Sequence, residues 1–180
     1  MEILLIADTR PMLFKVGEKV VYPNHGVGMI DQIAHSNLNG QSEKYYLVRV
    51  FTNGLKVTVP CLNAHTVGLR RTIKPAEIPQ VLRHLENGKV DAPRDWKLRF
   101  KQNSEKMRTG SLYDVAEVIK CLLRMGKTKP LSFREKKMLD RARHLLVSEL
   151  AIVRNVTEET VVDLVQKALG KSNLSLPEPT

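Results

Sequence analysis

The feature that most constrains this chain of 180 residues is a change in the period of its hydrophobic pattern at Lys74-Pro75. Before this point, β-branched and aromatic residues form short runs, which is the pattern of β-strands. After it, apolar residues recur at spacings of three and four, which is the pattern of amphipathic helices. The fold class predicted is therefore α+β in sequence order, with a β domain over residues 12–72 and a helical domain over residues 74–170.

The β domain is predicted to be a small antiparallel barrel of the Tudor or SH3 type. Asn39-Gly40 and Asn53-Gly54 punctuate its strand pattern, and Asn-Gly supplies the positive φ angles that tight hairpin turns need. Short strands joined by such turns form strongly bent sheets. Residues 1–11, which precede Met12, are expected to be an extension of this domain. The strands are expected at Val20–Tyr22, Val27–Ile33, Tyr45–Phe51 and Leu55–Val59.

The helical domain is predicted to be a bundle of about five helices. Ser111, Ser132 and Thr157 are each followed within three positions by an acidic residue, which is the signature of a helix N-terminus. The last helix is expected to end at Gly170. The ten residues after it, 171–180, include two prolines and are expected to form a mobile tail. The first two helices are expected from Pro79 to Leu85 and from Pro93 or Arg94 to Thr109.

The positive charge is concentrated in residues 94–143. This stretch holds 15 lysines and arginines against 6 aspartates and glutamates, so it supplies +9 of the total charge of +10. Residues 1–73 carry only +3. A polyanion, most commonly a nucleic acid, is the expected partner of such a basic surface. The single tryptophan, Trp96, begins the basic stretch, where an aromatic ring can stack on bases or wedge between them.

Helical spacing places the basic side chains on common faces of two predicted helices. Trp96 and Arg99 share one stripe, and three basic residues at i, i+3 and i+7 share another. Two alternatives stay open: the charges form only a solvated surface, and the tryptophan is a core residue. The candidate nucleic-acid-binding residues are Arg94, Trp96, Lys97, Arg99, Lys101, Arg134, Lys137 and Arg141.

The sequence lacks the motifs of catalysis and metal binding. It has no GxxxxGK[ST], GxGxxG, HExxH or GxSxG, and no two histidines are three or four residues apart. Cys61 and Cys121 lie in apolar runs without CxxC spacing and are expected to be free core thiols in a reducing cytosol. No apolar stretch approaches the ~18 residues of a membrane span. We therefore expect a cytoplasmic protein that is not an enzyme, with no metal, cofactor, small-molecule substrate or membrane partner.

Motifs from both predicted domains resemble the CarD/CdnL family of bacterial transcription regulators. The segment Phe14–Pro23, followed by His25-Gly26-Val27-Gly28, is similar to the start of the family's first domain. Trp96–Lys101 and Leu131–Arg143 are similar to its helical domain. The resemblance runs in order from about residue 13 to residue 169, so it covers both domains.

The resemblance implies a Tudor-like domain that binds the RNA polymerase β subunit at its β1 lobe. It also implies a helical domain that contacts promoter DNA at the upstream edge of the transcription bubble and stabilises the open complex. In such proteins the tryptophan matching Trp96 wedges into the minor groove, and the residues matching Arg99 and Lys101 hold adjacent phosphates. Some relatives carry arginines where this chain has Ser36 and Thr58. The expected polymerase-binding residues are therefore Arg49, Val57, Thr58, Val59 and Pro60.

A second hypothesis is a stand-alone nucleic-acid-binding protein, either architectural or ribosome-associated, whose barrel binds RNA. The low charge of the β domain favours a protein partner instead. The first hypothesis places the chain on the nucleoid, bound to RNA polymerase and promoter DNA.

Overall fold

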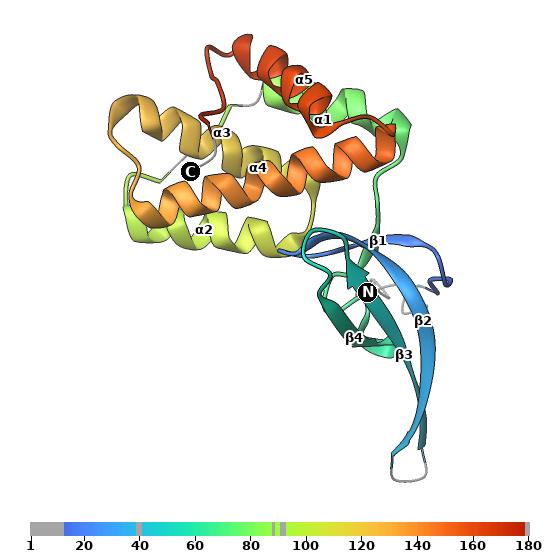
Figure 1. Ribbon diagram of the computed structural model, residues 1–180. Coiled ribbons are helices and arrows are strands. Elements are labelled where there is room, and N and C mark those ends of the chain that lie inside the picture. The colour runs from blue at the N-terminus through green and yellow to red at the C-terminus, as the bar shows by residue number, and fades with distance from the viewer. Residues whose placement is uncertain (1–12, 39–40, 88, 91–92, 179–180) are drawn as a thin grey trace, which may run out of the picture.

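The computed structural model describes residues 13–38, 41–87, 89–90 and 93–178, and a β domain precedes a helical domain as predicted (Figure 1). The strands of the described chain form one antiparallel sheet in the spatial order β4-β3-β2-β1-β5. The α+β fold class is thus confirmed. The strands are β1 (Lys19–Tyr22), β2 (Gly26–Leu38), β3 (Gln41–Val50), β4 (Lys56–Pro60) and β5 (Arg70–Arg71).

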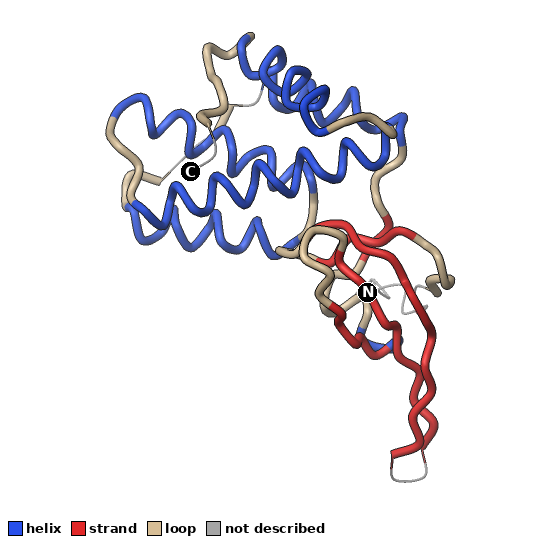
Figure 2. The backbone as a smooth tube through the Cα atoms, viewed as in Figure 1, coloured by secondary structure: helices blue, strands red, loops and turns tan. Residues whose placement is uncertain are grey.

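Strands β2 and β3 are longer than predicted and continue as a two-stranded ribbon beyond the rest of the sheet (Figure 2). Their pairing shifts register between Ile30 and Gln32, so that Asp31 is an extra residue in β2. Such a bulge bends the strand and increases its twist. The predicted turn at Asn39-Gly40 lies outside the described residues. The turn at Asn53-Gly54 is present, and Gly54 has a φ of +67°.

The β domain has its own hydrophobic core. Tyr46 is central to it: its hydroxyl accepts a hydrogen bond from the Phe14 amide at 3.1 Å, and the two rings meet edge to face with centroids 5.4 Å apart. Gly28 allows β2 to approach β3 closely, because a Cβ there would lie 2.6 Å from the Arg49 carbonyl oxygen. The buried core residues are Phe14, Val20, Ile30, Tyr46, Val48, Val59, Cys61, Ala64 and Leu69.

The helices begin at the predicted caps. The hydroxyl groups of Ser111, Ser132 and Thr157 each accept a hydrogen bond from the backbone amide three residues later. Ser132 and Glu135 form a complete capping box. The short 3-10 turns η1 (Cys61–Asn63) and η2 (Pro75–Glu77) connect β4 to β5 and β5 to the first helix. The helices are α1 (Ile78–Asn87), α2 (Trp96–Thr109), α3 (Leu112–Thr128), α4 (Phe133–Arg154) and α5 (Glu158–Gly170).

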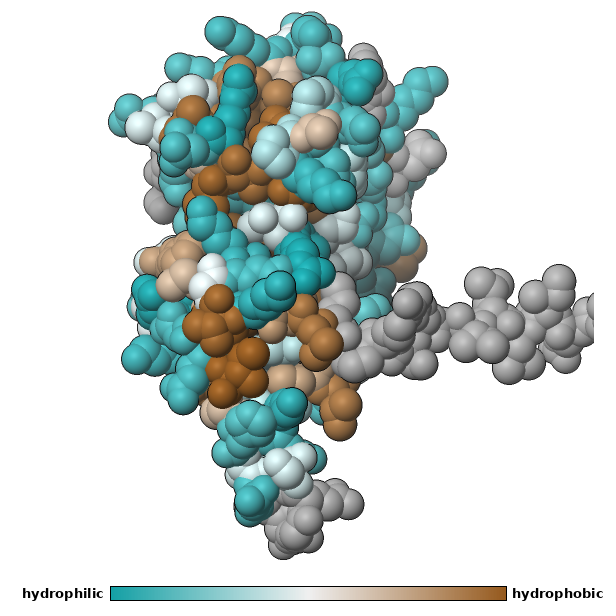
Figure 3. Space-filling view, turned by 90° about the vertical axis from the view of Figure 1, so that its right-hand side faces the viewer, coloured by the Kyte–Doolittle hydropathy of each residue, from teal (hydrophilic) through white to brown (hydrophobic). Residues whose placement is uncertain are grey.

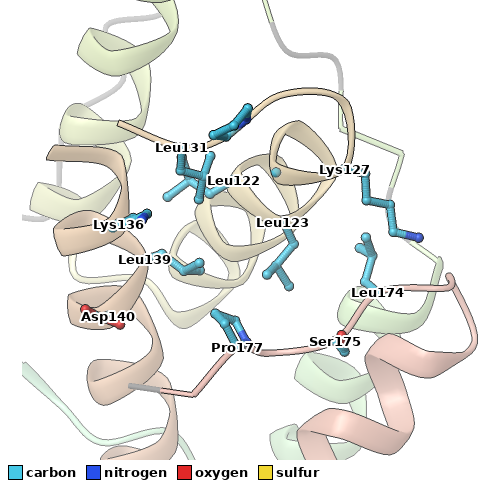
Figure 4. A pocket seen from close by; sticks show the side chains of 12 residues that line it. Leu122, Leu123, Lys127, Leu131, Lys136, Leu139, Asp140, Leu174, Ser175 and Pro177 are labelled. Atoms are coloured by element: carbon cyan, nitrogen blue, oxygen red, sulfur yellow. The ribbon is translucent and has the colours of Figure 1, made fainter. Parts of the chain in front are cut away.

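The C-terminal segment corrects the prediction of a mobile tail over residues 171–180 as far as it is described, through residue 178; residues 179–180 lie outside the described residues. Leu174 and Leu176 are only 5% and 6% exposed and belong to the core of the helical domain. The side chain of Gln166 in α5 holds the Leu176 backbone through two hydrogen bonds, of 2.9 and 3.1 Å. With α3 and α4 the segment lines a cavity of about 500 Å³, where Pro177 faces leucines of both helices (Figure 4). Burial of the two leucines outweighs the flexibility that the prolines suggested.

The two domains contact each other through α4 and the corner between α2 and α3. Arg70 of β5 pairs with Glu149 of α4 at 2.8 Å. Thr52, in the turn between β3 and β4, is hydrogen-bonded to His144 of α4 at 3.0 Å. The domains therefore share an interface with defined polar contacts, in addition to their covalent connection.

Candidate functional site

Trp96 lies at the surface, at the first position of α2. The Asp95 side chain caps this helix by accepting a hydrogen bond from the Leu98 amide at 2.9 Å. The Trp96 side chain is 54% exposed, and the Lys97 ammonium lies 5.9 Å from its ring centroid. A tryptophan in the core would be nearly fully buried. The structure therefore decides against the hypothesis that Trp96 is a core residue.

Arg99 differs from the expectation that it holds a phosphate, because the residue is buried. It is only 5% exposed. Its Nη1 donates a hydrogen bond to the Pro93 carbonyl at 2.7 Å, and its Nη2 lies 3.7 Å from the Glu135 carboxylate of α4. The guanidinium thus connects the segment before Trp96 to the first turn of α4. This corrects the assignment of Arg99 to the exposed basic face.

The reason for this error is the unusual inner face of α2. Arg99, Asn103 and Met107 are the buried residues of this helix, and Trp96 and Leu98 point outward. The Asn103 amide nitrogen lies 3.6 Å from the Cys121 sulfur of α3. A prediction from hydrophobic periodicity fails where polar residues face inward, because it assigns arginine and asparagine to the solvent side of the helix.

Glu135 supplies the negative charge next to Arg99. Burial would raise the pKa of this carboxyl group, but hydrogen bonds from the Ser132 amide and hydroxyl, together with the Arg99 charge, lower it below the usual value. The carboxylate therefore remains ionised at neutral pH. It both caps α4 and balances the buried guanidinium.

The start of α4 lies beside Trp96, although Trp96 and Phe133 are 37 positions apart in the sequence. Together they line a shallow hollow of about 590 Å³ with Lys129, Arg134 and neighbouring residues. Phe133 is 74% exposed, and the Lys137 ammonium lies 5.4 Å from its ring centroid. Sequence reasoning missed Phe133 and Lys129. The signal for Phe133 in the sequence was that this apolar residue does not fall on the stripe of apolar positions that α4 buries.

The other predicted basic residues are exposed. Arg94 and Lys97 lie within two residues of Trp96 in the sequence, and the rest lie on α2 and α4, the helices whose first turns line this hollow: Lys101, Lys137 and Arg141. The structure thus supports a common aromatic and basic surface, which we call the Trp96 face. It is formed by Arg94, Trp96, Lys97, Lys101, Lys129, Phe133, Arg134, Lys137 and Arg141.

The predicted polymerase-binding residues divide between two faces of the sheet. Thr58 points outward and Val59 inward, since successive side chains of a strand alternate. Val59 is 2% exposed, so its side chain cannot contact a partner, which corrects the prediction for Val59. Val57 packs against the core but is only partly buried, so it stays a candidate. Thr58 and Pro60 remain accessible to a partner, next to Leu47 and Tyr45 of β3.

Arg49 also lies on the outer face, where it pairs with Asp31 at 2.8 Å. The hydrogen bond from the Arg49 guanidinium lowers the pKa of the Asp31 carboxyl group. Strand β4 lies at the end of the sheet, so its outer edge has no strand partner among the described residues. Arg49, Thr58, Pro60 and the free edge of β4 form the second candidate surface, which we call the β4 edge.

Two exposed apolar side chains follow β4 in the sequence. Leu62 in η1 is 78% exposed, and Val67, between η1 and β5, is 40% exposed. Figure 3 displays the side of the molecule on which β1 and β2 lie in Figure 1, and hydrophobic residues gather over the β domain on that side as well. Exposed apolar groups next to a free strand edge are typical of a protein-binding surface.

Metal-binding clusters, disulfides and membrane-spanning helices are all absent from the described residues. Residues 13–38, 41–87, 89–90 and 93–178 contain no group of three or more His, Cys, Asp or Glu side chains able to hold a metal ion. Cys61 and Cys121 are buried and unbonded to one another. None of the described helices combines the length and the apolar character that a bilayer crossing requires.

Two family models match this chain, one for each domain. The model described as "CarD-like/TRCF RID domain" matches residues 14–73, and "CarD, C-terminal domain" matches residues 80–166. The chain is 32% identical over 149 residues to the "Putative transcription factor YdeB" of Bacillus subtilis (strain 168), which covers 83% of this chain and 97% of that relative. Among solved structures, CdnLNt from Myxococcus xanthus is 37% identical, covers 37% of this chain and 94% of its own, and has a TM-score of 0.30.

A β domain of the RID type followed by a basic helical domain defines a transcription factor that interacts with RNA polymerase. The chain belongs to the CarD family. The resemblance in both halves is thereby confirmed, and so is the Tudor-like assignment of the first domain.

Proposed function

We propose that this chain binds the β subunit of RNA polymerase through the β4 edge and stabilises the open promoter complex through the Trp96 face. The observation that carries the proposal is the exposure of Trp96, at 54%, among basic side chains from two helices. Lysines and arginines of the Trp96 face bind phosphates, and the indole ring enters the minor groove where duplex meets melted DNA.

The Trp96 face is suited to DNA shape more than to DNA sequence. Its charges supply affinity for the backbone, whereas reading bases in the major groove requires Asn, Gln or Arg side chains presented by an inserted helix. A wedge gains contacts at a fork, where the bases are already unstacked. Because it binds the open state more tightly than the closed state, it shifts the equilibrium toward open DNA and slows collapse of the bubble.

The β4 edge is suited to a protein partner. Its free backbone groups can pair with a strand of another chain, and Arg49, Thr58 and Pro60 then contact that strand's side chains. Attachment to polymerase raises the effective concentration of the helical domain near the promoter to about the millimolar range. A weak intrinsic affinity for DNA is then sufficient, and the polymerase directs the chain to the nucleoid.

Co-purification with RNA polymerase after nuclease treatment tests this function. The wild-type chain should remain bound, whereas Thr58→Glu, which places a charge on the β4 edge, should lower retention about tenfold. Lys89→Glu, at an exposed position outside both surfaces, is the matched control. Loss of the wild-type chain on nuclease treatment would favour the alternative of a stand-alone nucleic-acid-binding protein.

A further inference from the structure

One carboxylate on α4, that of Glu149, is bound entirely by groups from the end of the β domain and the linker. Glu149 is 1% exposed. Its two oxygens accept hydrogen bonds from Nη1 and Nη2 of Arg70, both at 2.8 Å, and Oε1 also accepts one from the Ile73 amide at 3.0 Å. This two-pronged geometry is the strongest that an arginine and a carboxylate form. The contact therefore joins the two domains through a buried, well-directed ion pair.

The same guanidinium also holds the end of α2. Nε and Nη2 of Arg70 donate hydrogen bonds to the Gly110 carbonyl, at 2.8 and 2.5 Å. Gly110 ends α2 in the left-handed conformation, with φ of +73°. Carbonyl groups at a helix C-terminus carry partial negative charge, so a cation there is favoured. Arg70 thus connects the β domain to α4 and to α2, the helix that begins at Trp96.

The surroundings of this contact are closely fitted. A Cβ at Gly68 would lie 2.9 Å from the Pro23 side chain, and one at Gly110 would lie 3.2 Å from it. A Cβ at Gly26 would lie 3.5 Å from the Leu145 side chain of α4. Backbone segments of both domains therefore meet at van der Waals distance. A joint of this kind has one preferred orientation, unlike a flexible linker.

We infer that Arg70 and Glu149 are positioning residues that hold the β4 edge and the Trp96 face in one fixed mutual orientation. In its consequence for transcription this inference rests on the proposed function. A chain bound to polymerase through one domain reaches the fork with the other only if the angle between them is correct. Free rotation at the joint would spread the Trp96 face over many positions and lower its effective concentration at the fork.

Distance measurements between the domains test the orientation directly. Spin labels are placed at the exposed positions Lys44→Cys on β3 and Gln102→Cys on α2, with the buried Cys61 and Cys121 replaced by alanine. The parent should give one narrow distance distribution. Arg70→Gln and Glu149→Gln should broaden it about twofold or shift it, because each removes the ion pair between the domains, and the first also leaves the buried Glu149 carboxylate without its charged partner. Unchanged narrow distributions in both variants would overturn the inference.

Arg71→Gln is the matched control. Arg71 is the neighbouring arginine of β5, and its carboxylate partner, Glu18, belongs to the same domain. This variant should keep the narrow distribution. If Arg70→Gln fails to fold, Arg70→Lys keeps the charge but not the two-pronged geometry. It should still broaden the distribution, and a parent-like result would contradict the positioning role.

Transcription measurements then separate this inference from the proposed function. For Arg70→Gln and Glu149→Gln, affinities for polymerase and for forked DNA, measured separately, should stay within about twofold of the parent, whereas the lifetime of the open complex should fall about tenfold or more. A parent that does not lengthen this lifetime would refute the proposed function, and the distances would still decide the orientation. Variants with broadened distances and an undiminished lifetime would refute the link between orientation and function.

Discussion

At the scale of single residues, exposure separates side chains that are accessible to a partner from those that support the fold. Trp96 and Arg99 are three residues apart on one helix, yet the first is exposed and the second is buried. Both belong to a basic sequence motif, and the motif alone does not distinguish their roles. Two predictions follow from the difference in their surroundings.

Trp96→Ala should leave stability almost unchanged and remove most of the effect on the open complex. Substitution of an exposed residue typically changes the free energy of unfolding by about 0.5 kcal/mol, against about 3–5 kcal/mol for a tryptophan in a core. Thermal denaturation and bubble lifetime under competitor challenge measure the two effects. Leu98→Ala, an exposed apolar position on the same helix, is the control. A markedly lower melting temperature, or an unchanged bubble lifetime, would contradict the wedge.

Lys101→Ala and Arg99→Ala should affect DNA binding differently. With about five phosphates neutralised, the logarithm of the affinity should fall with the logarithm of salt concentration at a slope of roughly −4 to −5. Loss of the exposed Lys101 should flatten this slope by about one unit. Loss of Arg99 should keep the slope and cost about 1.5–3 kcal/mol of stability, because the hydrogen bond to Pro93 and the charge beside Glu135 disappear. Salt titrations and urea denaturation of both variants check this, and equal slopes would refute the distinction.

At the scale of elements, the structure gives the C-terminal segment a stabilising role. Two buried leucines join it to α3, α4 and α5, and each buried leucine contributes about 1.5–3 kcal/mol. A segment with this much buried apolar surface behaves as part of the bundle.

The double substitution Leu174→Ala and Leu176→Ala should lower the free energy of unfolding by about 3 kcal/mol or more. Ser175→Ala, at the exposed position between them, should be neutral. Urea denaturation measures both. A double variant as stable as the wild type would mean that the tail is mobile, as the sequence suggested.

Features set by neighbouring residues were predictable from the sequence. The caps at Ser111, Ser132 and Thr157 depend on residues within one helical turn, and the change of period at Lys74-Pro75 marks the domain boundary. Features set by packing between distant segments were not predictable. The burial of Arg99 depends on the first turn of α4, and that of Leu174 depends on the groove that receives it. Strand alternation could have predicted that Val59 points inward. It was included among the candidates because the family resemblance covers the whole strand.

At the scale of the whole molecule, carboxylates held in ion pairs connect stability to pH. The hydrogen bond from Lys106 lowers the pKa of Glu117, and the one from Arg49 lowers that of Asp31. A carboxyl group whose pKa is lower in the folded state contributes its stability above the unfolded pKa and loses it as pH falls through the folded value. Glu117 lies in the helical domain and Asp31 in the β domain, so a fall in pH should destabilise both domains.

The urea midpoint should therefore be nearly constant between pH 6 and 7 as far as these carboxylates are concerned, and should fall steadily below about pH 4.3. Denaturation measured at several pH values tests this. Glu117→Gln should flatten the acid limb. An acid limb of unchanged steepness in this variant would show that its pairing with Lys106 contributes nothing to stability.

Division of the chain between residues 72 and 74 should give two fragments of unequal stability. Residues 12–72 contain the whole sheet, so this fragment should fold and bind polymerase. Residues 74–170 lose Arg70, Ile73 and the C-terminal segment, so this fragment should bind forked DNA but unfold at a lower temperature than the same region in the intact chain. Circular dichroism and binding assays on each fragment check both statements. Duplex binding by the β fragment equal to that of the full chain would contradict the division of roles.

The separation of 79 residues between Arg70 and Glu149 has a consequence for the protein while it is being made. Synthesis runs from the N-terminus, and domains generally fold as units in that order. The pairing of β1 with β5 completes the sheet without any helical residue. The Arg70 guanidinium is then exposed to water until its helical-domain partners, Gly110 and later Glu149, have been synthesised. We therefore expect docking of the helical domain to be the final step of folding. Under the proposed function, a chain that ends before residue 74 would present the complete β4 edge to polymerase without any residue of the Trp96 face, and we expect it to compete with the complete protein.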